Sequence, residues 1–351
     1  MADTSIRIGL VGAGAIARDR HIPGFRAIAG VEIAGVANRS RASGEQVAGQ
    51  FDIPHVYDTW EDVIADDSID AVVIGTWPYL HCPVTLAALA AGKHVLTEGR
   101  MAMDLAQAEQ MLAAARARPH LATQIAPGPF TLAVDGAIAR RVAEGYLGDL
   151  LAVEIRAADF RPGGLFLDRE APITWRQDRA FSGLNTMTLG IWYECALRWT
   201  PGVSSVIARA RTFVPMRREA QNGALRPASV PDHVAIVGDM PGGGTFQMTA
   251  SGVEGLGPTS EVWLYGSEGT LRFQQAGGTL WGGRRGDSQL AEIEVPEGER
   301  GGWRVEAEFV NAIRSEEQVT RTSFVDGVRY MAFTQAVLES AATGTLRPVL
   351  H

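Results

Sequence analysis

Cysteine is scarce in this sequence, where only Cys82 and Cys195 occur among 351 residues. The two belong to no CxxC pair or Cys/His pattern, and no other cluster has the spacing of metal ligands. We therefore expect two reduced, partly buried thiols and no metal site, rather than a fold held together by disulfides.

Excess positive charge and long apolar runs are missing as well. The formal net charge of -8 provides no basic surface for nucleic acid or for an anionic membrane. No apolar run reaches the length of a membrane-spanning helix, and the stretch MADTSIRIGLVGAG has no basic region before its first strand. We expect a cytoplasmic protein with a small-molecule substrate and with no nucleic-acid or membrane partner.

The pattern of apolar residues predicts two domains that differ in secondary structure. Residues 1–125 alternate strand-like runs such as IRIGLVGA, VEIAGVAN and AVVIGTW with Ala-rich amphipathic segments, which predicts a parallel sheet with helices on both faces. Residues 126–351 are rich in β-type runs such as LLAVEIRAADF and HVAIVGDM, with two helical segments near the end. The prediction is an α/β chain whose second domain is α+β with a largely antiparallel sheet.

The strongest motif lies at the end of the first predicted strand. The stretch IGLVGAGAIA places Gly12, Gly14 and Ala17 in a GxGxxA pattern between a strand and a helix. In this setting the glycines allow a tight turn and a close approach to a pyrophosphate at the helix N-terminus, with Ala15 and Ile16 in the same loop. This predicts a dinucleotide-binding Rossmann domain, the alternative being that the glycines only shape a turn.

The second predicted strand ends in Asn38 and Arg39. An NAD site usually has Asp or Glu there to bind the ribose 2′-hydroxyl, whereas this pair removes the negative charge and offers a guanidinium to a 2′-phosphate. The sequence therefore favours NADP over NAD. The simpler alternative, an NAD site beside a solvated Arg39, stays open.

Four stretches of the sequence are typical of one enzyme family. The stretches VGAGAIARDRHIPGF, DSIDAVVIGTWPYLHCPVTLAALAAGKHVLTE, LYGSEGTLRF and DGVRYMAFTQAVLESAATG resemble the Gfo/Idh/MocA oxidoreductases, the family of glucose-fructose oxidoreductase and inositol dehydrogenase. The resemblance implies a Rossmann domain followed by an α+β domain whose open sheet supports homo-oligomerisation. It also implies hydride transfer between a nicotinamide and a sugar, a cyclitol or a related hydroxy or carbonyl compound.

The chain departs from this family at the end of the fifth predicted strand. Members typically read Glu-Lys-Pro where this chain has Glu98, Gly99 and Arg100, so the lysine that would polarise or protonate the reacting oxygen is absent. Arg100 stays protonated, so it could stabilise an alkoxide or bind a carboxylate but could not act as a base. The alternative is an ordinary structural arginine.

A second departure falls in the stretch TLGIWYEC. It aligns with the family pattern Asp-x-Gly-x-His-x-x-Asp, so Thr188, Trp192 and Cys195 stand where an acid, a histidine and an acid are typical. Only Gly190 is kept, and the usual catalytic residues carry over to no position here. Tyr193 is a candidate because a tyrosine with a lowered pKa can act as acid or base, with core packing as the alternative.

Two hypotheses result from these residues. The first is an NADP-dependent oxidoreductase with a non-standard acid/base group, and the second is a catalytically inactive dinucleotide-binding sensor or accessory protein. We favour the enzyme because the cofactor motif is intact. His81 is a candidate for the site, and the alternative is that it only orients neighbouring groups. The remaining site residues predicted are, for catalysis, Tyr193, Arg100 and His81; for the cofactor, Thr76, Trp77, His81 and Glu98; and for the substrate pocket, Trp175, Arg176, Thr188 and Trp192.

Overall fold

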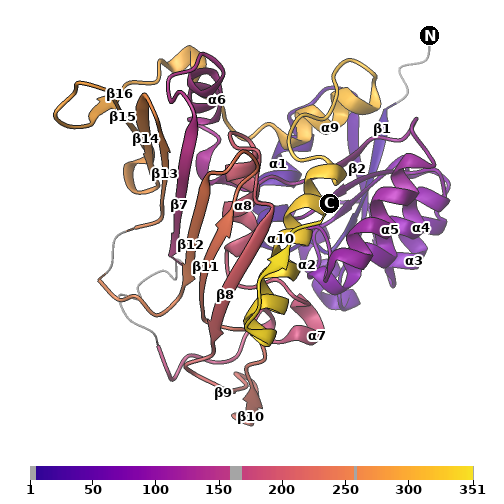
Figure 1. Ribbon diagram of the computed structural model, residues 1–351. Helices are drawn as coiled ribbons and strands as arrows, with labels where there is room; N and C mark the ends of the chain where they lie inside the picture. Colours follow the sequence, from indigo (N-terminus) through magenta and orange to yellow (C-terminus); the bar gives the residue numbers. More distant parts are fainter. Residues whose placement is uncertain (1–4, 159–167, 257–258, 351) are drawn as a thin grey trace. The chain divides into compact units, whose positions relative to one another are not determined.

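The computed structural model describes residues 5–158, 168–256 and 259–350 (Figure 1). The chain forms two compact units, one comprising residues up to Pro127 together with Arg304–Val328 and the other comprising Gly128–Trp303 and the residues from Arg329 on. The pattern of apolar residues predicts one second domain over residues 126–351. The structure differs at 304–328, because the helix α9 (Val305–Ile313) packs against α1 (Ile22–Arg26) of the first unit.

A six-stranded parallel sheet forms the first unit, with the strand order β3-β2-β1-β4-β5-β6. Its strands are β1 (Ile6–Val11), β2 (Val31–Ala37), β3 (His55–Tyr57), β4 (Ala71–Ile74), β5 (His94–Thr97) and β6 (Thr123–Ile125). All four residues of β4 are buried, as expected for a central parallel strand covered on both faces. The predicted Rossmann sheet is therefore confirmed.

The helices of the first unit begin at the side chains expected of helix caps. Its α-helices, besides α1 and α9, are α2 (Arg41–Gln50), α3 (Trp60–Ala65), α4 (His81–Ala90) and α5 (Leu105–Arg116). Ser40, Thr59 and Asp104 each accept a hydrogen bond from the backbone N–H three residues later, which satisfies one of the free donors of the first turn. Helices α1 and α9 lie on one face of the sheet and α3, α4 and α5 on the other (Figure 1).

A nine-stranded sheet forms the second unit, with the strand order β16-β15-β14-β13-β7-β12-β11-β8-β17. Only β7 and β12 pair in parallel among these described strands, so the prediction of a mostly antiparallel sheet is confirmed. Its strands are β7 (Leu150–Ala158), β8 (Ser205–Arg211), β11 (His233–Asp239), β12 (Thr245–Ser251), β13 (Glu261–Gly266), β14 (Gly269–Gln274), β15 (Thr279–Arg284), β16 (Ala291–Ile293) and β17 (Arg347–Pro348). A separate hairpin joins β9 (Met216–Arg218) to β10 (Leu225–Pro227).

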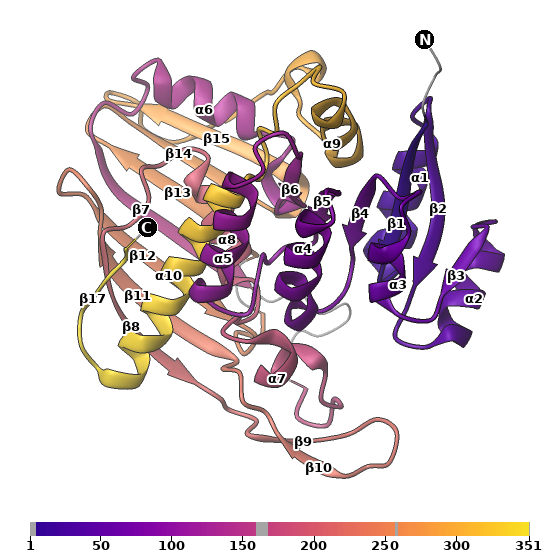
Figure 2. The ribbon, with the colours of Figure 1, turned by 90° about the vertical axis from the view of Figure 1, so that its right-hand side faces the viewer.

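Helices cover one face of the nine-stranded sheet. They are α6 (Asp135–Ala143), α7 (Arg179–Ser182), α8 (Leu189–Leu197) and α10 (Phe324–Thr343), of which α8 and α10 lie along the sheet (Figure 2). Tyr193 of α8 stacks on Phe333 of α10 with ring centroids 3.7 Å apart, and Phe246 of β12 meets both rings edge-on. The sheet's other face alternates with this core and carries exposed apolar side chains, including Ile207 and Val237.

Candidate functional site

The glycine turn after β1 closes tightly on the end of β4. Gly12 has φ +85°, a conformation that favours glycine, and a Cβ there would lie 2.7 Å from Thr76 Cγ2 and 2.9 Å from its backbone nitrogen. The sheet order places β1 beside β4, where the chain reverses direction across the sheet. Open α/β sheets bind their ligands at the carboxyl ends of the strands at this reversal. The predicted loop, Gly12 to Ile16, thus lies where a dinucleotide binds in this fold.

Asn38 supports the glycine turn from the neighbouring strand. Its Oδ1 accepts a hydrogen bond of 2.7 Å from the backbone N–H of Ala13, and its Nδ2 donates to the Ser43 carbonyl of α2 at 3.1 Å. The end of β2 therefore presents an amide that holds the loop, where an NAD site usually has a ribose-binding carboxylate.

A cation lies on an aromatic ring beside this turn. The guanidinium carbon of the exposed Arg39 is 5.7 Å from the centroid of the Trp77 ring, within range of a cation–π contact. The two side chains come from the ends of β2 and β4, so the structure brings together two residues that the sequence assigned separately to the cofactor. A guanidinium here can bind an anionic group at the adenosine end of a dinucleotide.

His81 connects two loops through backbone carbonyls. It is fully buried, with Nε2 3.0 Å from the Thr76 oxygen and Nδ1 2.9 Å from the Arg100 oxygen. Burial lowers its pKa, while the two carbonyls act in the opposite direction. Both ring nitrogens are thus engaged by the backbone, which favours the orienting role over acid/base catalysis.

The end of β5 carries the departure from the family pattern. Arg100 is buried, with 6% of its surface exposed, and its carbonyl faces His81. Gly99 has no room for a larger residue without movement of the chain, because a Cβ there would lie 3.0 Å from the Ala126 oxygen. Arg100 is therefore enclosed by the structure and is not a loosely solvated side chain.

The single lysine of the sequence has a structural environment. Lys93 is the only lysine in the sequence, and it precedes β5 at the opposite end of that strand from Glu98. Its Nζ donates to the carbonyls of Asp66 and Ile69 at 2.8 and 2.7 Å. These two hydrogen bonds give Lys93 a structural role at the amino end of β5.

His21, which was not predicted from the sequence as a site residue, is buried between two carboxylates. His21 Nε2 lies 2.8 Å from Glu98 Oε1, and His21 Nδ1 lies 2.5 Å from Glu306 Oε1. Burial lowers the pKa of His21, but the hydrogen bonds and charges of Glu306 and Glu98 outweigh burial and raise the pKa to about 9. The only sequence signal was a histidine shortly after the glycine loop, since Glu306 is 285 residues away.

In the second unit, Tyr193 lies in the core. It is 2% exposed, its hydroxyl accepts a 3.0 Å hydrogen bond from the Val203 N–H, and burial raises its pKa to about 12. A general base needs a pKa near the working pH, so this environment favours the core-packing alternative. Its catalytic role stays a prediction for turnover measurements to decide.

The neighbouring side chains of α8 are also enclosed. Trp192 is 1% exposed and stacks on Phe130, with ring centroids 4.9 Å apart. Arg198 donates to both Glu194 and Asp135 at 2.7 and 2.6 Å, which keeps these buried carboxylates paired. These contacts explain how α8 accommodates polar residues without a catalytic histidine or aspartate.

The remaining predicted pocket residues lie on different elements of this unit. Trp175 is half-buried under the Arg176 guanidinium, 4.3 Å from its ring centroid, in a 3-10 turn capped by Thr174. Thr188 precedes α8 as its N-cap, with a buried hydroxyl that has no hydrogen-bond partner among the described residues. These placements leave their assignment to a substrate pocket as a prediction.

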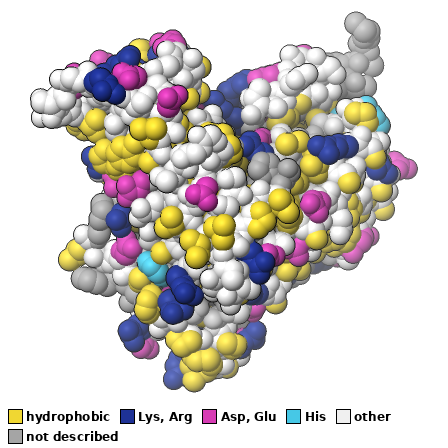
Figure 3. Space-filling view, viewed as in Figure 1, with side chains coloured by type: hydrophobic (Ala, Val, Ile, Leu, Met, Phe, Trp, Pro, Cys, Tyr) yellow, Lys and Arg dark blue, Asp and Glu magenta, His cyan; other side chains and the backbone are white. Residues whose placement is uncertain are grey.

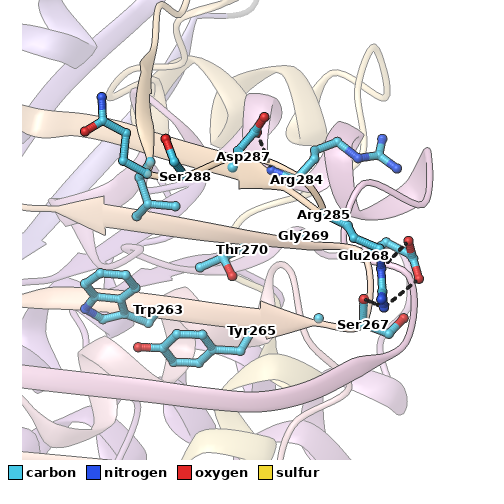
Figure 4. Close-up of a pocket in the computed structure, with 14 residues that line it drawn as sticks. Trp263, Tyr265, Ser267, Glu268, Gly269, Thr270, Arg284, Arg285, Asp287 and Ser288 are labelled. Carbon is cyan, nitrogen blue, oxygen red and sulfur yellow. Dashed lines mark hydrogen bonds and ion pairs between the residues drawn. The ribbon is translucent and has the colours of Figure 1, made fainter.

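A hollow on the nine-stranded sheet involves other residues. It has a volume of about 460 Å³ and is lined by the ends of β13, β14 and β15, including Trp263, Tyr265 and Thr270. Figure 4 shows the Trp263 and Tyr265 rings side by side on β13, with Thr270 on the neighbouring strand. None of the residues predicted from the sequence lines this hollow.

Among the described residues there is neither a metal-binding cluster nor a membrane-spanning helix. No group of three or more His, Cys, Asp or Glu side chains there could hold a metal ion. None of the described helices is both long and apolar enough to cross a bilayer.

Comparisons with known proteins agree with this architecture. The chain is 28% identical over 283 residues to the trans-1,2-dihydrobenzene-1,2-diol dehydrogenase of Mus musculus, covering 79% of this chain and 76% of that protein. It is 33% identical over 184 residues to the 1,5-anhydro-D-fructose reductase of Ensifer adhaerens, a match spanning only half of each chain. The structure of levoglucosan dehydrogenase with NADH and L-sorbose has a TM-score of 0.86 and covers 98% of this chain and 99% of its own, at 22% identity.

Family models account for both units. Residues 6–124 match the model of an oxidoreductase family with an NAD-binding Rossmann fold, and residues 137–272 match the GFO/IDH/MocA C-terminal domain. These segments contain the glycine turn and most of the nine-stranded sheet. The chain therefore belongs to the GFO/IDH/MocA oxidoreductase family.

Proposed function

We propose that this protein is an NADP(H)-dependent oxidoreductase that transfers a hydride between the nicotinamide and a small hydroxy or carbonyl compound. The observation that carries the proposal is the arrangement at the end of β2, where Asn38 supports the glycine turn and Arg39 lies on Trp77. A carboxylate there would repel a 2′-phosphate, whereas a guanidinium attracts it. NAD is the alternative cofactor, as in the NADH complex of levoglucosan dehydrogenase.

The substrate class proposed is a sugar, a cyclitol or a related compound. The relatives named above act on an anhydro sugar and on a dihydrobenzene diol, which share a ring that carries hydroxyl or carbonyl groups. Trp175, Arg176, Thr188 and Trp192 remain our proposed pocket residues, because aromatic and polar side chains together suit such a ring.

The acid/base step is proposed to be non-standard. Lys93 is committed to backbone carbonyls, so the charge on the reacting oxygen needs another partner. Arg100 follows β5, where ligands gather in this fold, and its permanent charge can stabilise an alkoxide without exchanging a proton. Tyr193 and His81 are the other candidates, although their buried hydrogen bonds favour structural roles.

The cofactor proposal is tested by fluorescence titration with NADPH and NADH. Arg39→Ala should weaken NADPH binding by about tenfold to a hundredfold, the loss of one charge-assisted bond to phosphate, and should leave NADH binding within about twofold. Arg41→Ala is the matched control, because Arg41 begins α2 only two residues after Arg39 but is paired with Glu45 and Asp58. Equal losses for both cofactors in Arg39→Ala would refute the NADP preference.

A second candidate function is a dinucleotide-binding sensor or accessory protein. The observation in its favour is that the only lysine is structural and Tyr193 is in the core. Anaerobic incubation of the bound reduced cofactor with a panel of carbonyl compounds separates the two functions. Oxidation by one compound establishes the enzyme and its substrate class, whereas tight binding without oxidation across the panel favours the sensor.

The protein is also proposed to form a homo-oligomer through the open face of the nine-stranded sheet. Strand register aligns side chains across this face, with Ile207 beside Val237, Trp263 beside Arg272, and Arg272 beside Trp281. Exposed apolar side chains on one flat face are typical of a protein interface. Apolar and basic side chains also gather over the β9–β10 hairpin, at the bottom of Figure 3.

A further inference from the structure

A cluster of three titratable side chains lies at the carboxyl end of β5. His21 is completely buried, and its ring connects Glu98, which directly follows β5, with Glu306 in the first turn of α9. His21 ends η1 (Ala17–His21), a π-helical turn that follows the glycine loop. Such turns are rare and occur frequently at functional sites. Three elements distant in sequence therefore converge on one imidazole.

The chain makes room for this cluster. Gly24, in α1, faces Glu306, and a Cβ at this position would lie 2.8 Å from Glu306 Oε2. Any larger residue would therefore displace the carboxylate that contacts the ring. The approach of Glu306 to His21 is a packed feature of the first unit and not a chance contact of surface side chains.

The geometry favours the charged form of the histidine. Each ring nitrogen faces a carboxylate oxygen, and only an imidazolium can donate to both, because a neutral ring has a single N–H. The charged groups that face the ring are Glu98 from β5 and Glu306 from α9, while Phe25 of α1 contributes an uncharged ring 6.3 Å away. With His21 protonated, the cluster carries one net negative charge.

Glu98 is the member of the cluster that reaches the surface of the first unit. Its side chain is 18% exposed, compared with 0% for His21 and 5% for Glu306. A dinucleotide with its pyrophosphate at the Gly12 turn and its adenosine near Arg39 would place its nicotinamide half towards the ends of β4 and β5. A carboxylate held at the end of β5 can accept a hydrogen bond from a ribose hydroxyl.

We propose that His21 is a positioning residue: held by Glu306, its imidazolium fixes the Glu98 carboxylate in the orientation that binds the nicotinamide ribose. This role rests on the proposed nicotinamide function. Loss of the proton frees Glu98 from its donor and adds a negative charge beside an anionic cofactor. Cofactor affinity therefore falls as the pH rises past the titration of His21.

The test compares three variants with the wild-type protein. His21→Gln removes the charge, and Glu306→Gln keeps the histidine but removes one of its two carboxylates. Glu308→Gln is the matched control, because Glu308 is buried in the same turn of α9 but accepts hydrogen bonds from Gln124 and Thr320. Circular dichroism establishes that each variant is folded before binding is measured.

The first measurement is the NADPH dissociation constant from pH 7 to pH 10. In the wild type and in Glu308→Gln, affinity should fall near pH 9, whereas in Glu306→Gln the fall should move to lower pH. His21→Gln should bind about tenfold more weakly at pH 7, with this pH dependence lost, as expected for one charge-assisted hydrogen bond. A purely structural histidine would give the same pH profile in Glu306→Gln as in Glu308→Gln.

The second measurement follows the His21 ring by ¹⁵N NMR without cofactor. Titration near pH 9 in the wild type and at lower pH in Glu306→Gln supports the charged cluster, and titration near 6.5 in both overturns it. If the wild type binds the cofactor but both cluster variants keep its pH profile, the positioning role is refuted while the proposed function stands. If the wild type binds neither NADPH nor NADH at any pH, both proposals fail.

Discussion

Raising the pH should remove a stabilising charge from the interior of the first unit. Burial alone would lower the pKa of His21, but Glu306 and Glu98 raise it from 6.5 to about 9. A raised pKa means that the folded state binds the proton more tightly than the unfolded state. The stabilisation is therefore complete below pH 6.5 and is lost as the pH rises through about 9. It amounts to about 3 kcal/mol, because each unit of difference between the folded and unfolded pKa is worth about 1.4 kcal/mol.

The assay is urea unfolding of the wild type and of His21→Gln between pH 6 and pH 10. The difference between their free energies of unfolding isolates the histidine, because all other titrating groups are common to both proteins. This difference should shrink by about 3 kcal/mol between the two ends of the range. The wild type should approach the variant at high pH, where His21 is neutral.

The control for this prediction is His94→Gln. Burial lowers the pKa of His94, so this ring is neutral throughout the alkaline range and cannot titrate there. The difference between the wild type and His94→Gln should stay constant from pH 7 to pH 10. A constant difference for His21→Gln over the same range would refute the reasoning, because it would mean that His21 is not charged in the folded protein.

Three further substitutions, one of them with a control variant, test other parts of the molecule. Gly12→Ala should lower the free energy of unfolding by about 1–3 kcal/mol, because the added Cβ would meet Thr76. The same substitution should abolish tight NADPH binding in the titration. Gly49→Ala is the control, and because the space around Gly49 is open, it should be neutral or stabilising. Tyr193→Phe should lower the free energy of unfolding in urea by about 1–3 kcal/mol, because the Val203 N–H loses its acceptor. Turnover must also fall if Tyr193 is catalytic, and unchanged turnover would remove this residue from the mechanism. Val237→Glu places a charge on the open sheet face and should shift the protein to a smaller species in sedimentation velocity, while an unchanged assembly would exclude this face as the interface.

The fold was largely predictable because its signals are local. The glycine loop, the alternation of strands and helices, and the helix start at Asp104 each depend on residues a few positions apart. The division of the chain was less predictable. Residues 304–328 return to the first unit through contacts such as that between α9 and α1, and no local pattern records which partner an amphipathic helix packs against.

The site shows the same contrast between local and distant information. An apolar helix that lines a pocket and one that packs in a core have similar sequences, so the stretch around Tyr193 could not distinguish the two. The structure places this tyrosine against Phe333 and Phe246. Likewise, the pairing of Asn38 with the Ala13 N–H gives the amide at the end of β2 a supporting role that its position alone did not reveal.

The sequence by itself indicated the Rossmann domain, the glycine turn, the pair Asn38 and Arg39 after β2, and glycine in place of the lysine typical of the family. Each of these features depends on a short stretch of residues. Only the tertiary structure decided that Lys93 donates to backbone carbonyls and that His21 lies between two carboxylates that raise its pKa. The pKa of His21 depends on Glu98 and Glu306, which are 77 and 285 residues away in the sequence. A pKa is set by what surrounds a group in space, and folding alone brings those surroundings together.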